Sequence, residues 1–378
     1  MWKQRWIVGL VGVAVFCLSL KPLSAEEVPS GTKPQQAAVK PADPLLVEVD
    51  KAIAVSTRRF LTANIHTPWQ IMHGVLALRQ KYEVKQDGQK INALEWMSKG
   101  VTFKGDQWFE RTRYGGRAHP YSVAYAFEGH PNQFLAIMAM AEVPADHEIV
   151  TRGTDTIRVS DLVKHAQMEI NSSVEITWTL WALSHYLGTD AMWTNKNGEA
   201  WSIERLVQMQ TQEPVRSAAC GGSHGLFALT YARNEYLKKG APLRGVWFEA
   251  DQKIQRYIRE ARSYQNSDWT FSTNYFSGRQ HSNSFETRLN TSGHTLEFLM
   301  LALPKERLRE QWIRNGVFAV TRDLLTHQRS PAECGSLYHA LDALVIYRDR
   351  TKPKPAPEVA ATENTTKKTD DSVASPEK

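Results

Sequence analysis

Five histidines occupy similar places in the sequence, each at or beside the start of an apolar segment: His73, His130, His224, His294 and His339. A sixth apolar segment, at 176–187, is preceded by Ser172, Ser173 and Glu175 instead. With Glu175 marking that segment, successive starts are 45 to 70 residues apart. Imidazole binds metal ions and transfers protons near neutral pH, so a recurring histidine predicts a cavity mouth that binds a ligand or a partner. The alternative is a structural role, in which each histidine bonds to a neighbouring repeat.

Two cysteines stand close to two of these histidines. Cys220 precedes His224 by four residues, and Cys334 precedes His339 by five. Zinc takes three or four ligands and favours thiolate and imidazole, so these four residues, together with His294, form a candidate zinc site. Nothing in the sequence requires a cofactor, and zinc is the cofactor that these residues could bind. Two alternatives stay open: a Cys220–Cys334 disulfide, as thiols tend to form in exported proteins, or two unpaired cysteines packed as small apolar side chains.

The stretch 274–294 is the longest interruption of the repeating pattern and is rich in polar side chains. Polysaccharide lyases neutralise a uronate carboxylate and use tyrosine or histidine to move the proton. Arg279 would neutralise the carboxylate, and Tyr275 would protonate the leaving oxygen. Either His224 or His294 would abstract the proton. The alternative is a solvated loop that happens to be polar.

Other side chains on the apolar segments would reach the same cavity. A glycoside hydrolase needs two opposed carboxylates, for which the candidates are Glu175, Glu297 and Asp342. Asn290 and Tyr338 lie beside the fourth and fifth histidines and complete the expected lining. Aromatic residues at such positions could hold a sugar ring or an apolar chain, although they are more often part of a core.

The apolar segments alternate with amphipathic ones. In 247–264, Trp247, Ile254 and Ile258 fall on one stripe and Arg256 lies off it, as in a helix with one exposed face. Segments at 73–78, 134–141, 176–187, 224–232, 294–303 and 339–346 are apolar nearly all round, as in helices surrounded by other helices. One helix of each kind per unit predicts an all-α array of about six helical hairpins. Turn signals within 83–118 predict a small β-hairpin or loop insertion there.

Three segments carry a resemblance to a known superfamily: Gln265–Phe271 (QNSDWTF), Asn290–Phe298 (NTSGHTLEF) and Gly335–Leu344 (GSLYHALDAL). They resemble the α/α toroids of terpenoid (squalene) cyclases and protein prenyltransferases, and the pattern is similar to secreted bacterial toroid proteins of unknown function. The resemblance implies that 44–350 forms an α/α toroid, with inner and outer rings of helices.

The resemblance also implies a third function, a zinc-dependent prenyltransferase-like or cyclase-like activity. The prenyltransferases bind zinc through Asp, Cys and His, and their histidine lies in a Tyr-His element like Tyr338–His339. Only His339 carries over, because no Asp-x-Cys element precedes His294. The Asp-x-Asp-Asp acid element of squalene cyclases has no counterpart either, which argues against triterpene cyclisation.

The N-terminal residues predict that the protein is exported. Residues 1–25 combine an early positive charge, a short apolar stretch and a small terminal residue, which is typical of a signal peptide. The protein is therefore expected in the periplasm or outside the cell, with no membrane span after cleavage; the alternative is an uncleaved anchor. Residues 26–43 and 351–378 are polar and proline-rich, and predict a linker and a disordered tail.

The composition excludes several classes of protein. The 378 residues are 42% hydrophobic with three cysteines, which fits a large core and excludes a disulfide-dense mini-domain. The formal charge of +6 falls to +3 without residues 1–25, which hold three basic residues and no acidic one. A near-neutral chain gives no support to nucleic-acid binding. The expected partner is an unknown small molecule, a glycan or a protein.

Overall fold

The computed structural model describes residues 43–120 and 125–352. The predicted signal peptide, nearly all of the predicted linker and nearly all of the predicted tail lie outside the described residues. The first helix, α1, begins at Pro44, where Asp43 accepts a hydrogen bond from the backbone N–H of Leu45 at 3.1 Å. The last helix, α12, ends at Thr351. Within the described ranges, no helix combines the length and the apolar composition of a membrane span.

Helices make up most of the described chain, as predicted for an all-α protein. Their bounds are α1 Pro44–Thr57, α2 Pro68–Leu78, α3 Ala93–Met97, α4 Gln133–Met140, α5 Val159–Glu169, α6 Thr177–Tyr186, α7 Ile203–Gln212, α8 Ser223–Lys238, α9 Val246–Ser263, α10 Phe285–Ala302, α11 Gln311–Thr326 and α12 Cys334–Thr351. Short 3-10 turns occur at Arg79–Lys81, Ala219–Gly222 and Lys305–Arg309.

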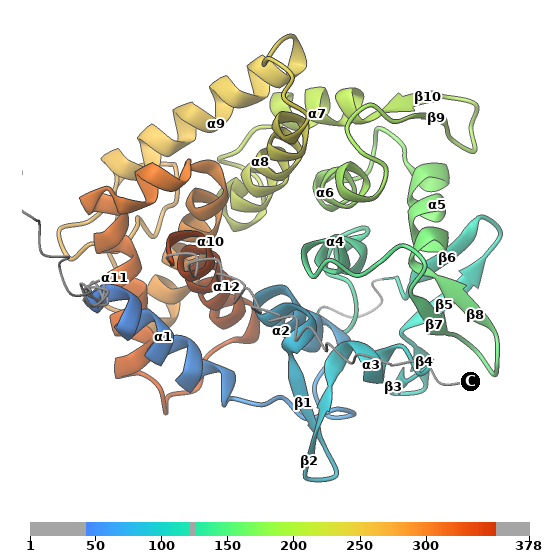
Figure 1. Cartoon of the computed structure of the whole chain (residues 1–378), viewed down its shortest axis with the longest axis horizontal. Coiled ribbons are helices and arrows are strands. Elements are labelled where there is room, and N and C mark those ends of the chain that lie inside the picture. The colour runs from blue at the N-terminus through green and yellow to red at the C-terminus, as the bar shows by residue number, and fades with distance from the viewer. Residues whose placement is uncertain (1–42, 121–124, 353–378) are drawn as a thin grey trace, which may run out of the picture. The chain divides into compact units, whose positions relative to one another are not determined.

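Six of these helices contact one another in a closed circuit. Helix α2 packs on α4, α4 on α6, α6 on α8, α8 on α10, α10 on α12, and α12 returns to α2 (Figure 1). They are the segments that are apolar nearly all round, and α12 buries side chains on every face. Helices α1, α5, α7, α9 and α11 lie outside this circuit in the same view and bury one stripe each, which explains their amphipathic sequences.

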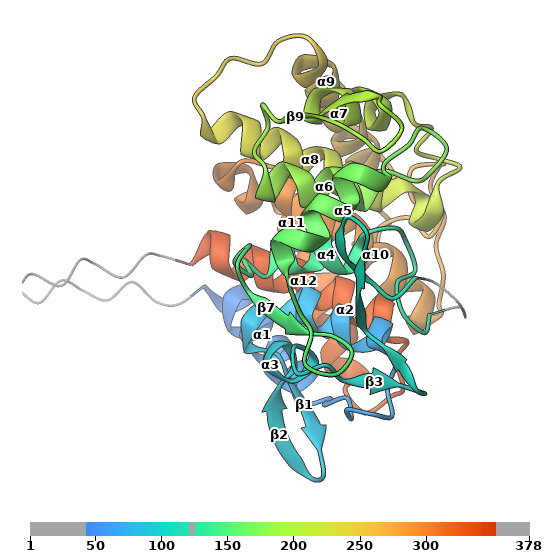
Figure 2. The same cartoon turned by 90° about the vertical axis from the view of Figure 1, so that its right-hand side faces the viewer.

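Within residues 43–120 and 125–352, the strands pair as two-stranded antiparallel hairpins. Three lie in the predicted insertion: β1 Glu83–Gln86 with β2 Gln89–Asn92, β3 Thr102–Phe103 with β4 Asp106–Gln107, and β5 Phe109–Thr112 with β6 Gly115–Ala118. Figure 2 shows the β1–β2 hairpin extending away from the helices. Two further hairpins were not predicted: β7 Glu148–Val150 with β8 Thr156–Arg158, and β9 Met192–Thr194 with β10 Ala200–Ser202. The Asn197–Gly198 pair in the last one is a turn signal, and Gly198 has a φ of 79°.

Local capping sets where the inner helices begin. Thr67 and Gln70 form a reciprocal capping box that starts α2, so His73 falls in its second turn. The Glu333 carboxylate accepts hydrogen bonds from the backbone N–H groups of Gly335 and Ser336 at 2.8 and 2.7 Å, which starts α12. These caps fix which turn of each helix carries a histidine.

Candidate functional site

The structure brings all five recurrent histidines together. The ring centroids of His294 and His339 are 4.0 Å apart, and those of His224 lie 5.0 and 5.1 Å from them. His73 lies 5.4 Å from His339, and His130 lies 5.7 Å from His224. All five line one pocket of about 920 Å³, which we call the mouth pocket.

The backbone orients two of these rings. The Nδ1 of His73 lies 2.7 Å from the carbonyl oxygen of Trp69, and the Nδ1 of His294 lies 2.8 Å from that of Asn290. A carbonyl only accepts, so each Nδ1 carries the proton and donates it. Nε2 is then left with a free lone pair, the form that binds a metal ion.

Carboxylates orient two other rings. The Nδ1 of His339 is hydrogen-bonded to Glu297 at 2.9 Å, and both side chains are buried. The Nδ1 of His130 is hydrogen-bonded to Glu175 at 2.6 Å, with both side chains partly exposed. Glu175 and Glu297 therefore each orient a different histidine.

Three potential metal ligands converge in the mouth pocket. The Sγ of Cys220 and one ring nitrogen each of His224 and His294 all lie within 4.8 Å of one another. Both ring nitrogens of His224 are buried and have no hydrogen-bond partner among the described residues. Unpaired buried polar atoms destabilise a fold unless something binds them. The Cys220–His224–His294 cluster is therefore the place in the described chain where a bound ion would satisfy an orphaned group.

A strained turn places the thiol in this cluster. Cys220 has a φ of 49° and lies in the Ala219–Gly222 turn, directly before α8. Gly221 packs so closely on the Tyr275 ring that a Cβ there would lie 2.2 Å from its Cγ. Positive φ is unusual for a residue other than glycine, and such strain is common at functional sites. The strained backbone and the ligand distances therefore both single out Cys220 as a functional residue.

Burial keeps the cluster uncharged when no metal is bound. It holds the pKa of His224 and of His294 well below the ordinary value, and the neighbouring imidazoles lower both further. Burial also raises the pKa of the Cys220 thiol to about 11. The imidazoles are thus neutral and able to bind at pH 7, whereas the thiol must lose a proton to become a ligand.

Of the other two predicted zinc ligands, Cys334 begins α12 beside Gln70 of α2 and lies outside the cluster. His339 lies in the mouth pocket beside His294, with its Nδ1 hydrogen-bonded to Glu297. Both cysteines are free thiols in the described chain, so the disulfide alternative is not formed. The reason is positional: Cys220 faces the cluster, while Cys334 faces α2.

The predicted lyase set is only partly assembled. The rings of Tyr275 and His294 are 6.4 Å apart, and the buried Tyr275 hydroxyl has no partner in the described structure. Arg279 instead donates a hydrogen bond to the carbonyl oxygen of Ser263 at 2.7 Å and does not line the mouth pocket. The group that was expected to neutralise a uronate is therefore outside the site.

Two more predicted residues belong to the core. The Tyr338 hydroxyl is hydrogen-bonded to that of Tyr82 at 2.9 Å, and both rings are almost fully buried. Asp342 is fully buried and forms an ion pair with Arg79 at 2.5 Å. Tyr338 is thus not part of the cavity lining. Asn290 does line the mouth pocket, and its backbone carbonyl orients His294.

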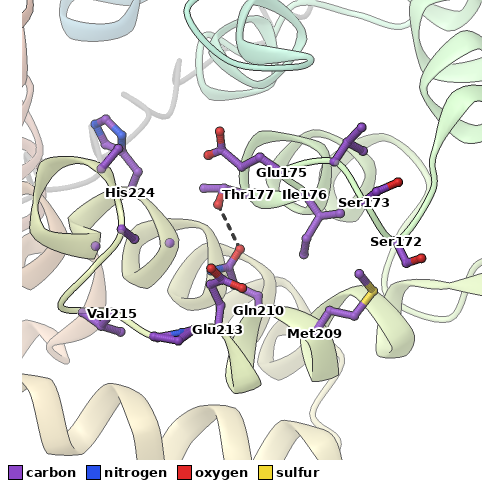
Figure 3. A pocket seen from close by; sticks show the side chains of 16 residues that line it. Ser172, Ser173, Glu175, Ile176, Thr177, Met209, Gln210, Glu213, Val215 and His224 are labelled. Carbon is purple, nitrogen blue, oxygen red and sulfur yellow. Dashed lines mark hydrogen bonds between the residues drawn. The ribbon is translucent and has the colours of Figure 1, made fainter.

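Two other hollows adjoin the mouth pocket. One, of about 420 Å³, runs from His224 to Ser172 and Ser173, and Glu175 projects into it (Figure 3). Its floor includes a hydrogen bond from the Thr177 hydroxyl to Gln210 at 3.0 Å, which ties α6 to α7. The other, of about 910 Å³, lies beside β5–β6 and meets the mouth pocket at Gly129 and His130. We call it the hairpin hollow.

The sequence analysis missed the charged residues around these hollows. Glu286 and Glu333 line the mouth pocket, and Arg111, Arg113 and Arg117 line the hairpin hollow. The run RTRYGGR at 111–117 is a visible sequence signal for the arginines. Nothing in the sequence places them beside His130, because that neighbourhood depends on how β5–β6 packs against α5.

Comparison with known proteins gives no relative: no protein-family model matches the chain, and no curated protein or solved structure is significantly similar to it.

Proposed function

We propose that the protein binds a zinc ion through Cys220, His224 and His294 and uses it to bind a ligand in the mouth pocket. The observation that carries this proposal is the convergence of the three ligand atoms within 4.8 Å of one another. One thiolate and two imidazoles are a donor set that zinc favours over calcium or magnesium.

Three protein ligands leave a coordination position open. Structural zinc sites use four protein ligands, whereas sites that act on a substrate keep one position for water or substrate. A zinc ion at such a position polarises a carbonyl or lowers the pKa of bound water. The protein's own contribution is the mouth pocket, in which the backbone carbonyl of Asn290 orients the His294 ring.

The neighbouring histidines support binding in another way. The Nδ1 of His73 donates to the Trp69 carbonyl, so His73 presents its Nε2 as an acceptor, and Glu297 fixes the orientation of the His339 ring. The mouth pocket therefore combines a metal position with a neutral acceptor at His73. This supports a ligand with hydrogen-bond donors more than a purely apolar chain such as an isoprenoid.

We also propose that the fold is an α/α toroid and that the protein is exported. The closed circuit of α2, α4, α6, α8, α10 and α12 supports the first proposal. The signal-like pattern of residues 1–25 supports the second.

The test is the metal content and the free-thiol count of protein purified without reductant or chelator. We expect about one zinc per chain, with loss of the metal in Cys220→Ser, His224→Ala and His294→Ala. Cys334→Ser and His185→Ala are the matched thiol and imidazole controls and should keep it. Absence of metal after loading with zinc, in folded protein with both thiols reactive, would overturn the proposal.

A polysaccharide lyase is the second candidate, because the Tyr275 and His294 rings lie 6.4 Å apart and the buried Tyr275 hydroxyl has no partner among the described residues. Such an enzyme would convert oligogalacturonate into an unsaturated product, detected by its ultraviolet absorbance. Cleavage by metal-free protein that is lost in Tyr275→Phe would favour the lyase over the zinc site. Cleavage that persists in Tyr275→Phe would exclude Tyr275 as the group that protonates the leaving oxygen.

A further inference from the structure

The combined volume of the mouth pocket and the hairpin hollow is larger than one small molecule would fill. Each has the volume of a typical small-ligand site, at about 920 and 910 Å³, and they adjoin at Gly129 and His130, which line both. The Cys220–His224–His294 cluster lies in the first of them. A ligand that fills both is therefore elongated and passes over His130.

The hairpin hollow carries excess positive charge. Arg117 is paired with Glu110 at 2.6 Å, and Lys196 with Glu169 at 2.5 Å. Burial raises the pKa of Glu128 to about 8, so this third acid in the hollow is mostly uncharged at pH 7. Arg113 lies over the Tyr114 ring and has no carboxylate partner among the described residues. Arg111 donates only to the carbonyl oxygen of Thr156, so two arginine charges remain free.

The mouth pocket carries the opposite charge. Glu286 accepts a hydrogen bond from the backbone N–H of Glu333 at 3.0 Å, and Glu333 caps α12. Neither carboxylate has a basic partner among the residues described. Besides these two carboxylates, the ionisable side chains that line the mouth pocket are the five histidines, Cys220 and Tyr125, and none of them is a carboxylic acid. The two adjoining pockets thus differ in the sign of their charge, and the Cys220–His224–His294 cluster lies in the one that holds Glu286 and Glu333.

We propose that the ligand is a peptide chain, bound with a carboxylate in the hairpin hollow at Arg111 and Arg113 and an amino group toward Glu286 and Glu333. This inference names the ligand class of the site under Proposed function and rests on it for the central part. A peptide carries both charges at its ends, whereas an acidic polysaccharide would place like charges beside Glu286 and Glu333. Arginine also binds carboxylates in a bidentate manner, which gives the chain one direction.

The test is a binding titration of the full zinc-loaded chain with the pentapeptide Ala-Ala-Ala-Ala-Glu. We expect Arg113→Gln to weaken binding about tenfold, as expected for a lost charge-assisted hydrogen bond. Amidation of both peptide carboxyl groups should weaken binding to the parent protein to a similar degree and have little effect in the variant. Acetylation of the peptide amino group should likewise weaken binding to the parent protein and have little effect on binding to Glu286→Gln. Arg259→Gln changes an exposed arginine on α9 and is the matched control.

Each outcome separates this inference from the proposed function. If zinc binds but the free and the blocked peptides bind with the same affinity, the peptide inference alone is overturned. Tight binding of oligogalacturonate with none of the peptide would replace the peptide by an acidic glycan. If no zinc binds, the proposed function fails. A peptide affinity that depends on Arg113 in the metal-free protein would still support recognition of the peptide carboxylate in the hairpin hollow.

Discussion

The Glu297 carboxyl group is hydrogen-bonded to the Nδ1 of His339 at 2.9 Å, between two inner helices that bury both side chains. Burial raises the pKa of Glu297 to about 8 and lowers that of His339 to about 3, so both groups are neutral at pH 7. The contact is a hydrogen bond between neutral groups that sets the direction of a ring in the mouth pocket.

Loss of the Glu297 side chain should destabilise the protein. Glu297→Ala leaves the His339 Nδ1 buried without a partner, which should lower the free energy of unfolding by about 1–3 kcal/mol. Glu297→Gln keeps an oxygen and an N–H group at this position and should be milder. Urea unfolding of the two variants measures the difference. Equal losses would show that the hydrogen bond contributes nothing.

Gly293 lies beside the site, where α10 approaches α12 closely. A Cβ there would lie 2.9 Å from the backbone N and Cα of Ala340. Gly293→Ala should therefore force the helices apart and lower the free energy of unfolding by about 1–3 kcal/mol. Its neighbour His294 should shift, so zinc affinity should fall as well.

Gly225→Ala is the matched control, because its Cβ would meet only the end of the flexible Gln210 side chain. The helix propensity of alanine exceeds that of glycine by about 1 kcal/mol, which should offset part of that contact. Thermal unfolding of both variants is the measurement, and a larger loss in Gly225→Ala would contradict the close approach of α10 and α12.

The buried Glu128 should make stability fall as the pH rises. Its pKa is about 8 in the folded chain because of burial, against the ordinary value of 4.5. Its contribution is fully present below pH 4.5 and is lost as the pH rises toward 8, because the unfolded chain releases the proton first. Glu128→Gln cannot ionise, and its oxygen can still accept from the backbone N–H of Phe134, as Glu128 does at 2.8 Å.

The stability of Glu128→Gln relative to the parent should therefore increase from pH 5 to pH 8, by up to about 1.4 kcal/mol per pH unit. Chemical denaturation at the two pH values checks this. A difference that is independent of pH would mean that Glu128 is ionised at both.

Zinc affinity should depend on pH through Cys220. The thiol has a pKa of about 11, whereas the pKa of His224 and of His294 lies well below 6.5. Between pH 7 and 9, binding then releases one proton, from the thiol, and the apparent Kd should fall about tenfold per pH unit. Competition with a chelator at pH 7, 8 and 9 measures the slope. A slope near zero would remove Cys220 from the ligand set.

The sequence by itself determined the helical class and the recurrence of histidine. Segments such as 294–303 and 339–346 are apolar nearly all round, so they had to be surrounded by other helices, and α10 and α12 are. The signals Asp87–Gly88 and Tyr114–Gly116 were enough to predict the β structure in 83–118, because such turns are local.

Only the tertiary structure decided which side chains meet. Cys220 and Cys334 have similar spacing to the next histidine, yet only the turn before α8 directs its thiol toward His294. Arg279 lies four residues from Tyr275 but bonds to the end of α9 instead of lining the pocket. Local patterns fix helices and turns through contacts close in sequence, whereas a site is made by contacts between residues far apart, which helix packing and loop geometry set together.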